Sequence, residues 1–169
     1  MIELLEGEKI ILQKRRHWYI IASESSVLFF AAVVPALVFI WIVSALSYEV
    51  IAPVMPLIVF AFAGWFLILW IIFFIFWTNY YLDVLIVTNK RVIDIEQRGL
   101  FARDIAETSI KNIQDIKIEV IGILATLWDF GDIHIQTAGE SREMAIRSIA
   151  NPHEVRKKIS EQHHETPRI

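Results

Sequence analysis

Two long uncharged hydrophobic runs occupy the first half of the chain. Residues 25–46 and 54–77 contain no Asp, Glu, Lys, Arg or His, and a short connector with Glu49 separates them. Uncharged runs beyond about 18 residues are typical of helices that cross a hydrocarbon core ~30 Å thick. We therefore predict a two-helix transmembrane hairpin over 25–78, with spans at about 26–46 and 54–77. A buried helix pair in a soluble protein is the alternative, which such length disfavours.

Beyond residue 79 the pattern changes to short alternating segments separated by turn residues. Alternation of apolar and polar positions is the mark of a half-buried strand. Strands are predicted at 80–87, 91–96, 100–107, 110–120, 132–137 and 142–149. Residues 122–132 are predicted as a loop or short helix, and Gly99 suits a turn that needs positive φ.

The C-terminal part of the pattern indicates one amphipathic helix. Asn151 offers an N-cap, Pro152 fits the first helical position, and Val155 and Ile159 form a one-sided apolar stripe. We therefore predict that residues 79–163 form a small all-β domain, an antiparallel barrel or sandwich closed by this helix. Residues 164–169 are expected to be a polar tail.

Lys and Arg near the two runs set the expected orientation. Lys9 and the Lys14–Arg16 group precede the first run, while Lys90, Arg91 and Arg98 follow the second; the connector has no Lys or Arg. Because basic residues collect in cytoplasmic loops, both termini should be cytoplasmic, in a multi-pass protein of the cytoplasmic (inner) membrane. Residues 1–24 are then a cytoplasmic segment. They lack a long apolar core, so we expect no cleavable signal peptide.

Composition excludes several classes of function. The 169 residues include no cysteine, which rules out disulfides, thiolate nucleophiles and cysteine metal sites. A net charge of -3 argues against nucleic acid as a partner, because phosphates need a basic face. The absence of ionisable residues inside the runs disfavours a transporter or pump.

Candidate catalytic and metal-binding groups do not converge in the sequence. His134 and Asp132 share one face of a predicted strand, but a zinc site needs further ligands and none is spaced nearby. There is no nucleophile elbow and no glycine-rich phosphate loop. We expect no enzymatic activity, no cofactor and no metal site.

Two sets of residues are candidate contacts. Basic side chains near a membrane attract anionic lipid by ~1 kcal/mol each, so five are candidate lipid-headgroup contacts: Lys14, Arg15, Arg16, Lys90 and Arg91. The alternative is that the first three set topology and that Arg91 pairs with an acid such as Asp83 or Asp94, or anchors the domain against the membrane. Trp128 and Phe130 are candidate partner contacts; their alternatives are closure of the core or contact with the membrane interface.

Several short motifs follow one another in a recognisable order. They are Gly7-Glu8, the stretch RRHW at 15–18, YLDVLIVTNKRVIDI at 81–95 with Thr88, Arg91 and Val92, then Gly99, Arg103, the 110–113 segment and FGDIHIQT at 130–137. Together with two spans, this order resembles the second type of bacterial PH-like membrane domain, over nearly the whole chain. The resemblance implies a bent antiparallel sheet capped by the C-terminal helix, and it implies little about activity.

These observations favour a membrane-anchored, non-enzymatic interaction or scaffold module on the cytoplasmic face. Membrane lipid surrounds the spans, and the domain binds a protein partner or assembles with copies of itself as a homo-oligomer. The alternative is sensing of anionic lipid or envelope stress through the juxtamembrane basic residues. An enzyme that acts on lipids is a weaker third hypothesis, because no acid–base pair converges in the sequence.

Overall fold

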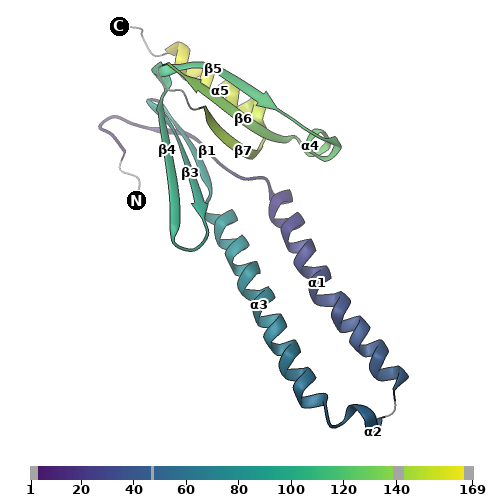
Figure 1. Ribbon diagram of the computed structural model, residues 1–169. Helices are drawn as coiled ribbons and strands as arrows, with labels where there is room; N and C mark the ends of the chain where they lie inside the picture. The colour runs from purple at the N-terminus through teal and green to yellow at the C-terminus, as the bar shows by residue number, and fades with distance from the viewer. Residues whose placement is uncertain (1–3, 47, 139–142, 166–169) are drawn as a thin grey trace. The chain divides into compact units, whose positions relative to one another are not determined.

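The computed structural model describes residues 4–46, 48–138 and 143–165 (Figure 1). It divides into two compact units. One unit comprises Met1–Ile20 and Asn79–Ile169, and the other is Ile21–Thr78. The first residue of the predicted strand 142–149 and the last four residues of the predicted tail lie outside the described residues.

Two long helices, α1 (Trp18–Ala45) and α3 (Met55–Leu82), account for the apolar half, and the short α2 (Tyr48–Ile51) lies between them. Both long helices are long and apolar enough to cross a membrane. No described residue of α1 is buried, and in α3 only Leu69 is. Within this unit the Trp65 Nε1 donates to the Ala31 carbonyl at 3.1 Å. The two predicted apolar helices are confirmed.

The helices are longer than the predicted spans. α1 begins eight residues before residue 26, and α3 continues five residues past residue 77. The difference has a physical cause. An uncharged window measures the part of a helix that fits a hydrocarbon core, whereas helical hydrogen bonding continues through polar residues on either side.

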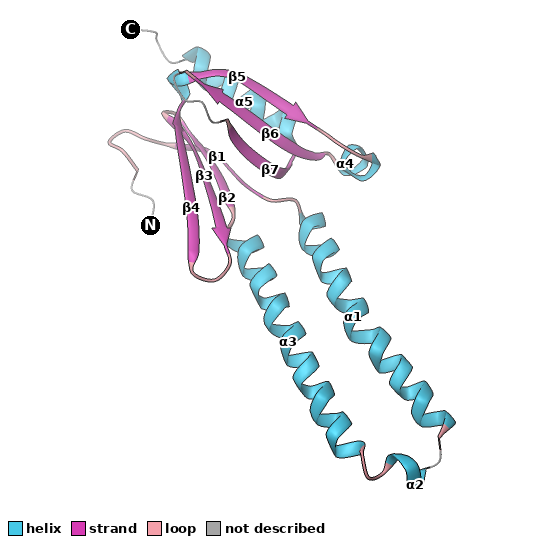
Figure 2. Ribbon diagram, in the orientation of Figure 1, coloured by secondary structure: helices cyan, strands magenta, loops and turns pink. Residues whose placement is uncertain are grey.

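The second unit contains two antiparallel sheets and a C-terminal helix (Figure 2). The four-stranded sheet has the order β1-β2-β3-β4, with strands β1 (Ile10–Arg15), β2 (Val84–Thr88), β3 (Arg91–Arg98) and β4 (Ala102–Ser109). The three-stranded sheet has the order β5-β6-β7, with strands β5 (Ile113–Glu119), β6 (Phe130–Thr137) and β7 (Met144–Ala150). The remaining elements are η1 (Ile110–Asn112), α4 (Ile123–Trp128) and α5 (Pro152–Glu165). This matches the predicted fold class.

Strand β1 is the element that sequence analysis missed. Its residues pair antiparallel with β2, with Ile10 opposite Thr88 and Arg15 opposite Val84. The sequence IILQKR shows little alternation of apolar and polar residues, so no local pattern predicts a strand. Its strand conformation depends on pairing with β2, which is distant in the sequence. Because β1 precedes α1 and β2 follows α3, the apolar helices are inserted between two neighbouring strands of one sheet.

The core of the domain lies between the two sheets and α5. Its main cluster includes Val92 from β3, Ile133 and Ile135 from β6, and Val155 and Ile159 from α5, all 0% exposed. Burial of a side chain of this size stabilises a fold by ~1.5–3 kcal/mol. The apolar stripe predicted for the C-terminal helix is therefore the surface that closes the core.

The FGD stretch of β6 makes a close backbone approach. A Cβ atom built on Gly131 would lie 2.6 Å from the backbone oxygen of Glu119 on β5. The following Asp132 accepts a hydrogen bond from the Ser148 N–H through Oδ1 at 2.7 Å. Glycine at 131 lets β5 and β6 approach, and the aspartate fixes β7 against them, so this motif is structural.

Candidate functional site

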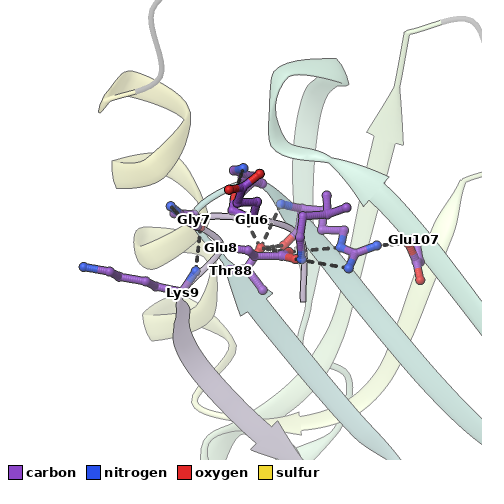
Figure 3. Close-up of polar contacts among 10 residues, drawn as sticks. Glu6, Gly7, Glu8, Lys9, Thr88 and Glu107 are labelled. Atoms are coloured by element: carbon purple, nitrogen blue, oxygen red, sulfur yellow. Dashed lines mark hydrogen bonds and ion pairs between the residues drawn. The ribbon is translucent and has the colours of Figure 1, made fainter. Parts of the chain in front are cut away.

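A buried ion pair joins the segment before β1 to the start of β3. Glu8 Oε1 lies 3.0 Å from Arg91 Nε, and Glu8 Oε2 accepts from Arg91 Nη2 at 3.1 Å (Figure 3). The Glu8 side chain is 0% exposed and that of Arg91 is 16% exposed. A third residue, Glu107 on β4, accepts from Arg91 Nη1 at 2.6 Å. The guanidinium therefore holds two carboxylates, one of them in a two-point arrangement that adds geometric specificity.

Hydrogen bonds from other donors complete the surroundings of the Glu8 carboxylate. The Leu5 N–H donates to Oε2 at 2.7 Å, and the Thr88 hydroxyl donates to Oε1 at 2.8 Å. Burial by itself would raise the pKa of Glu8. The hydrogen bonds from Arg91, Leu5 and Thr88, with the charge of Arg91, outweigh it and lower the pKa from 4.5 to about 2. Glu8 is thus a permanently charged structural group at neutral pH.

The turn between β2 and β3 is also tied to the N-terminal segment. The Lys9 N–H donates to Asn89 Oδ1 at 2.9 Å, and the Asn89 N–H donates to the Lys9 carbonyl at 3.1 Å. Lys90 Nζ donates to the Glu6 carbonyl at 2.6 Å. The Gly7-Glu8 motif and the TNKR motif therefore bind each other, and their charges are used within the domain.

Arg91 pairs with acids, as the alternative to lipid contact had it, but with other acids than the two examples named for it. Sequence analysis named Asp83 or Asp94, whereas the structure pairs Arg91 with Glu8 and Glu107. Strand register explains the pair with Glu107. Arg91 lies opposite Ser109 on β4, and Glu107 lies two residues before Ser109 on the same face of the sheet. Glu8 was missed because nothing local predicts a pair between residues 83 positions apart.

The other predicted basic group, on β1, also contacts the domain itself. Lys14 Nζ pairs with Glu154 on α5 at 2.8 Å, and the Arg15 guanidinium lies 4.3 Å from the centre of the Tyr81 ring. Because β1 and β2 are antiparallel, Arg15 and the 88–91 turn lie near opposite ends of their ladder, ~17 Å apart along the strand. The five candidate lipid contacts therefore do not form one pocket.

Arg16 is the centre of a small acidic cluster. Its Nε lies 3.0 Å from Asp83 Oδ2, and its Nη2 donates to Glu96 Oε1 at 2.9 Å. Asp83 Oδ1 accepts from the Gln97 N–H at 2.5 Å. Arg16, Asp83, Glu96 and Asp94 line a small cavity whose other walls come from β2, β3 and β7. Burial raises the pKa of Asp83 despite the hydrogen bond from Gln97 and the charge of Arg16.

Asp94 is a second carboxyl group of this cluster with a raised pKa. Burial raises the pKa of Asp94 from 3.8 to about 6, and the negative charges of Glu96 and Asp83 add to the effect while Arg16 opposes it. The folded state then binds this proton more tightly than the unfolded state. The contribution of Asp94 to domain stability should consequently fall as pH rises from about 4 to about 6.

Asp94→Asn is therefore expected to raise the midpoint of unfolding at neutral pH and to change it little near pH 4, where Asp94 is already protonated. Denaturant unfolding of the full chain in detergent at the two pH values measures this difference. The control is Asp104→Asn, since Asp104 is 57% exposed beside Arg98. An equal gain at both pH values for Asp94→Asn would contradict the assignment.

Trp128 and Phe130 belong to an aromatic cluster with the residues that lead into α1. Phe130 stacks with His17 at 4.9 Å and with Tyr19 at 5.3 Å between ring centroids. Trp128 lies 5.2 Å from both Trp18 and Tyr19. Phe130 is only 9% exposed, while Trp128 is 38% exposed. Phe130 is therefore buried within this aromatic cluster, whereas Trp128 remains partly exposed.

Within residues 4–46, 48–138 and 143–165, no group of three or more His, Asp or Glu side chains is placed to hold a metal ion. His134 lies 3.8 Å from Glu119 and 3.7 Å from Glu143. Asp132, its neighbour on the strand, is engaged by the Ser148 N–H.

Comparison with known proteins identifies the domain. The Bacterial PH domain family matches residues 19–163. No curated protein shows a significant match. Among solved structures, a DUF1696 family protein with a pleckstrin-homology domain from Shewanella loihica PV-4 is 19% identical, with a TM-score of 0.39, over 48% of this chain and 70% of that one. A pleckstrin homology domain from Shewanella amazonensis SB2B is 17% identical, with a TM-score of 0.40. The match covers 48% of this chain and 66% of that one. The family match spans most of the sequence, and the chain therefore belongs to the bacterial PH domain family.

Proposed function

We propose that this protein is a membrane-anchored, non-enzymatic interaction module. The helices α1 and α3 cross the cytoplasmic membrane, and the PH-like domain lies on its cytoplasmic face with both termini. There it binds a protein partner or assembles with copies of itself. The observation that carries the proposal is the insertion of two apolar helices between the adjacent strands β1 and β2 of one PH-like sheet.

The surfaces of the two helices support a membrane location. Large apolar side chains such as Phe60, Trp41 and Leu57 are 81%, 70% and 75% exposed. A helix that is hydrophobic on all sides needs lipid or protein around it, because water cannot solvate such a surface without a large cost. The Lys and Arg bias on the chain outside the spans supports cytoplasmic termini.

The polar groups of the domain support a binding role rather than catalysis. Two of the perturbed carboxylates are held by cations of the domain itself, Glu8 by Arg91 and Asp83 by Arg16. By contrast, β4 is an edge strand in the described sheet, and its first six residues are exposed. An open edge with exposed side chains is a surface on which a protein partner adds a strand.

Cross-linking in native membranes followed by purification in mild detergent tests the interaction role. We expect a reproducible cross-linked partner or a homo-oligomer that survives purification. A chain that remains a monomer without cross-links, under conditions that preserve other membrane complexes, would contradict the proposal.

Sensing of anionic lipid receives less support. Lys14, Arg16, Lys90 and Arg91 all contact acceptors of the domain itself. Arg15 is exposed over the Tyr81 ring and is the best remaining candidate. If the alternative holds, Arg15→Glu should reduce the anionic lipid that co-purifies with the protein, and Arg15→Lys should preserve it.

A further inference from the structure

We propose that the PH-like domain itself docks on the lipid bilayer through two apolar projections. The first is the tip of the β3–β4 hairpin with Leu100 and Phe101, and the second is the α4 segment with Ile121, Ile123 and Leu127. This inference rests on the proposed membrane anchoring and adds to it a second, peripheral contact of the domain with lipid.

The hairpin tip is an unusually exposed apolar turn. Phe101 is 99% exposed and Leu100 is 40% exposed. Gly99, with φ 77°, begins the turn, so the chain reverses there and presents the two side chains outward. Because both side chains are apolar, this tip is unfavourable in water and favourable in an apolar phase.

Strand register places the tip at the end of the sheet from which α3 enters it. Val84, the first residue of β2, pairs with Ile95, and the Gln97 N–H donates to the Asp83 carboxylate at 2.5 Å. The hairpin therefore continues past the start of β2, by ~10 Å for the three strand residues 96–98 beyond Ile95. Figure 2 shows the β3–β4 turn at this end of the four-stranded sheet. Asp83 alone separates α3 from β2.

The α4 segment lies where the chain enters the other apolar helix. Ile121, Ile123 and Leu127 are 81%, 86% and 71% exposed. At the end of α4, Trp128 lies 5.2 Å from Trp18 and Tyr19, the first two residues of α1. Only two residues, 16 and 17, separate β1 from α1.

Lipid is the occupant that these positions favour. Within the domain, each projection lies where the chain passes into an apolar helix: the hairpin tip at the end of the sheet where β2 begins, and α4 beside the first residues of α1. Trp and Tyr collect at membrane interfaces because their rings are partly apolar and partly polar. The parts of the chain that lead into α1 and out of α3 carry such rings: Trp18, Tyr19, Tyr81 and Trp128. Arg15 beside Tyr81 adds a cation where anionic headgroups lie.

Single cysteines test the contact cleanly because the chain has no cysteine of its own. Phe101→Cys and Ile123→Cys are labelled with an environment-sensitive fluorophore, and the full chain is reconstituted in vesicles of lipids with brominated acyl chains. The matched control is Lys111→Cys, an exposed site beyond Ser109, which register places at the opposite end of β4 from the tip. Phe60→Cys, 81% exposed on α3, reports the span itself.

We expect a blue shift and several-fold stronger quenching at 101 and 123 than at 111, with strong quenching at 60. Quenching at 60 without quenching at 101 and 123 would overturn the inference and leave membrane anchoring intact. No quenching at 60 would defeat the anchoring proposal itself. A blue shift at 101 and 123 without quenching, together with cross-links between copies, would assign these projections to a protein interface and also overturn the inference.

Discussion

Glu8→Ala is expected to destabilise the PH-like domain by ~3–5 kcal/mol, the usual cost of removing one partner of a buried ion pair. The substitution leaves the Arg91 guanidinium, 16% exposed, without its two-point partner, and it also removes the acceptor of the Leu5 N–H and the Thr88 hydroxyl. Denaturant unfolding of the full chain in detergent, at neutral pH, measures the loss.

Glu107→Ala is the matched control, because Glu107 pairs with the same guanidinium but its side chain is 43% exposed. Exposed ion pairs contribute ~0–1 kcal/mol, so this variant should remain near the parent protein. Equal losses in the two variants would show that burial of Glu8 does not set the energy of the pair.

The same carboxylate predicts a pH dependence with a definite sign. The pKa of Glu8 is about 2 in the folded state and 4.5 when unperturbed, so its contribution is present above pH 4.5 and is lost as pH falls toward 2. Glu8→Gln should remove that part of the acid dependence. A Glu8→Gln variant whose stability falls as steeply with acid as the parent's would contradict the assignment.

Gly131→Ala is the second substitution with a large expected effect. Its new methyl group would lie 2.6 Å from the Glu119 backbone oxygen, so β5 and β6 must separate. Overpacking of this kind costs ~1–3 kcal/mol, and the unfolding midpoint should fall accordingly. Gly64→Ala in α3 is the control, since nothing lies within 4 Å of its built Cβ atom. Gly131→Ala with the parent's midpoint would contradict the close approach.

What the sequence could predict was set by how local each signal is. The apolar runs are continuous, so both long helices were predictable from length and charge alone. Val155 and Ile159 are four residues apart, so they lie on one face of a helix, and their burial in the core was predictable from this spacing. Strand β1 and the Glu8–Arg91 pair depend on partners about 70–80 positions away, which no local pattern encodes.

The candidate contacts show the same limit. Pairing of Arg91 with an acid was the alternative to lipid contact, and the identity of the acid required the register of β3 with β4 and the path of the N-terminal segment. Phe130 and Trp128 are two residues apart and were treated alike, yet one is buried against His17 and the other remains partly exposed. The left-handed conformation of Asp129, with φ 50°, separates their environments.

In the proposed arrangement, α1 and α3 cross the membrane and the PH-like domain lies in the cytoplasm. Glu49→Cys in α2 and Lys157→Cys in α5 place single thiols on exposed positions of the connector and of the domain. A membrane-impermeant maleimide added to intact cells should label position 49 and should reach position 157 only after the membrane is opened. Labelling of both positions from the same side would contradict the two-span arrangement.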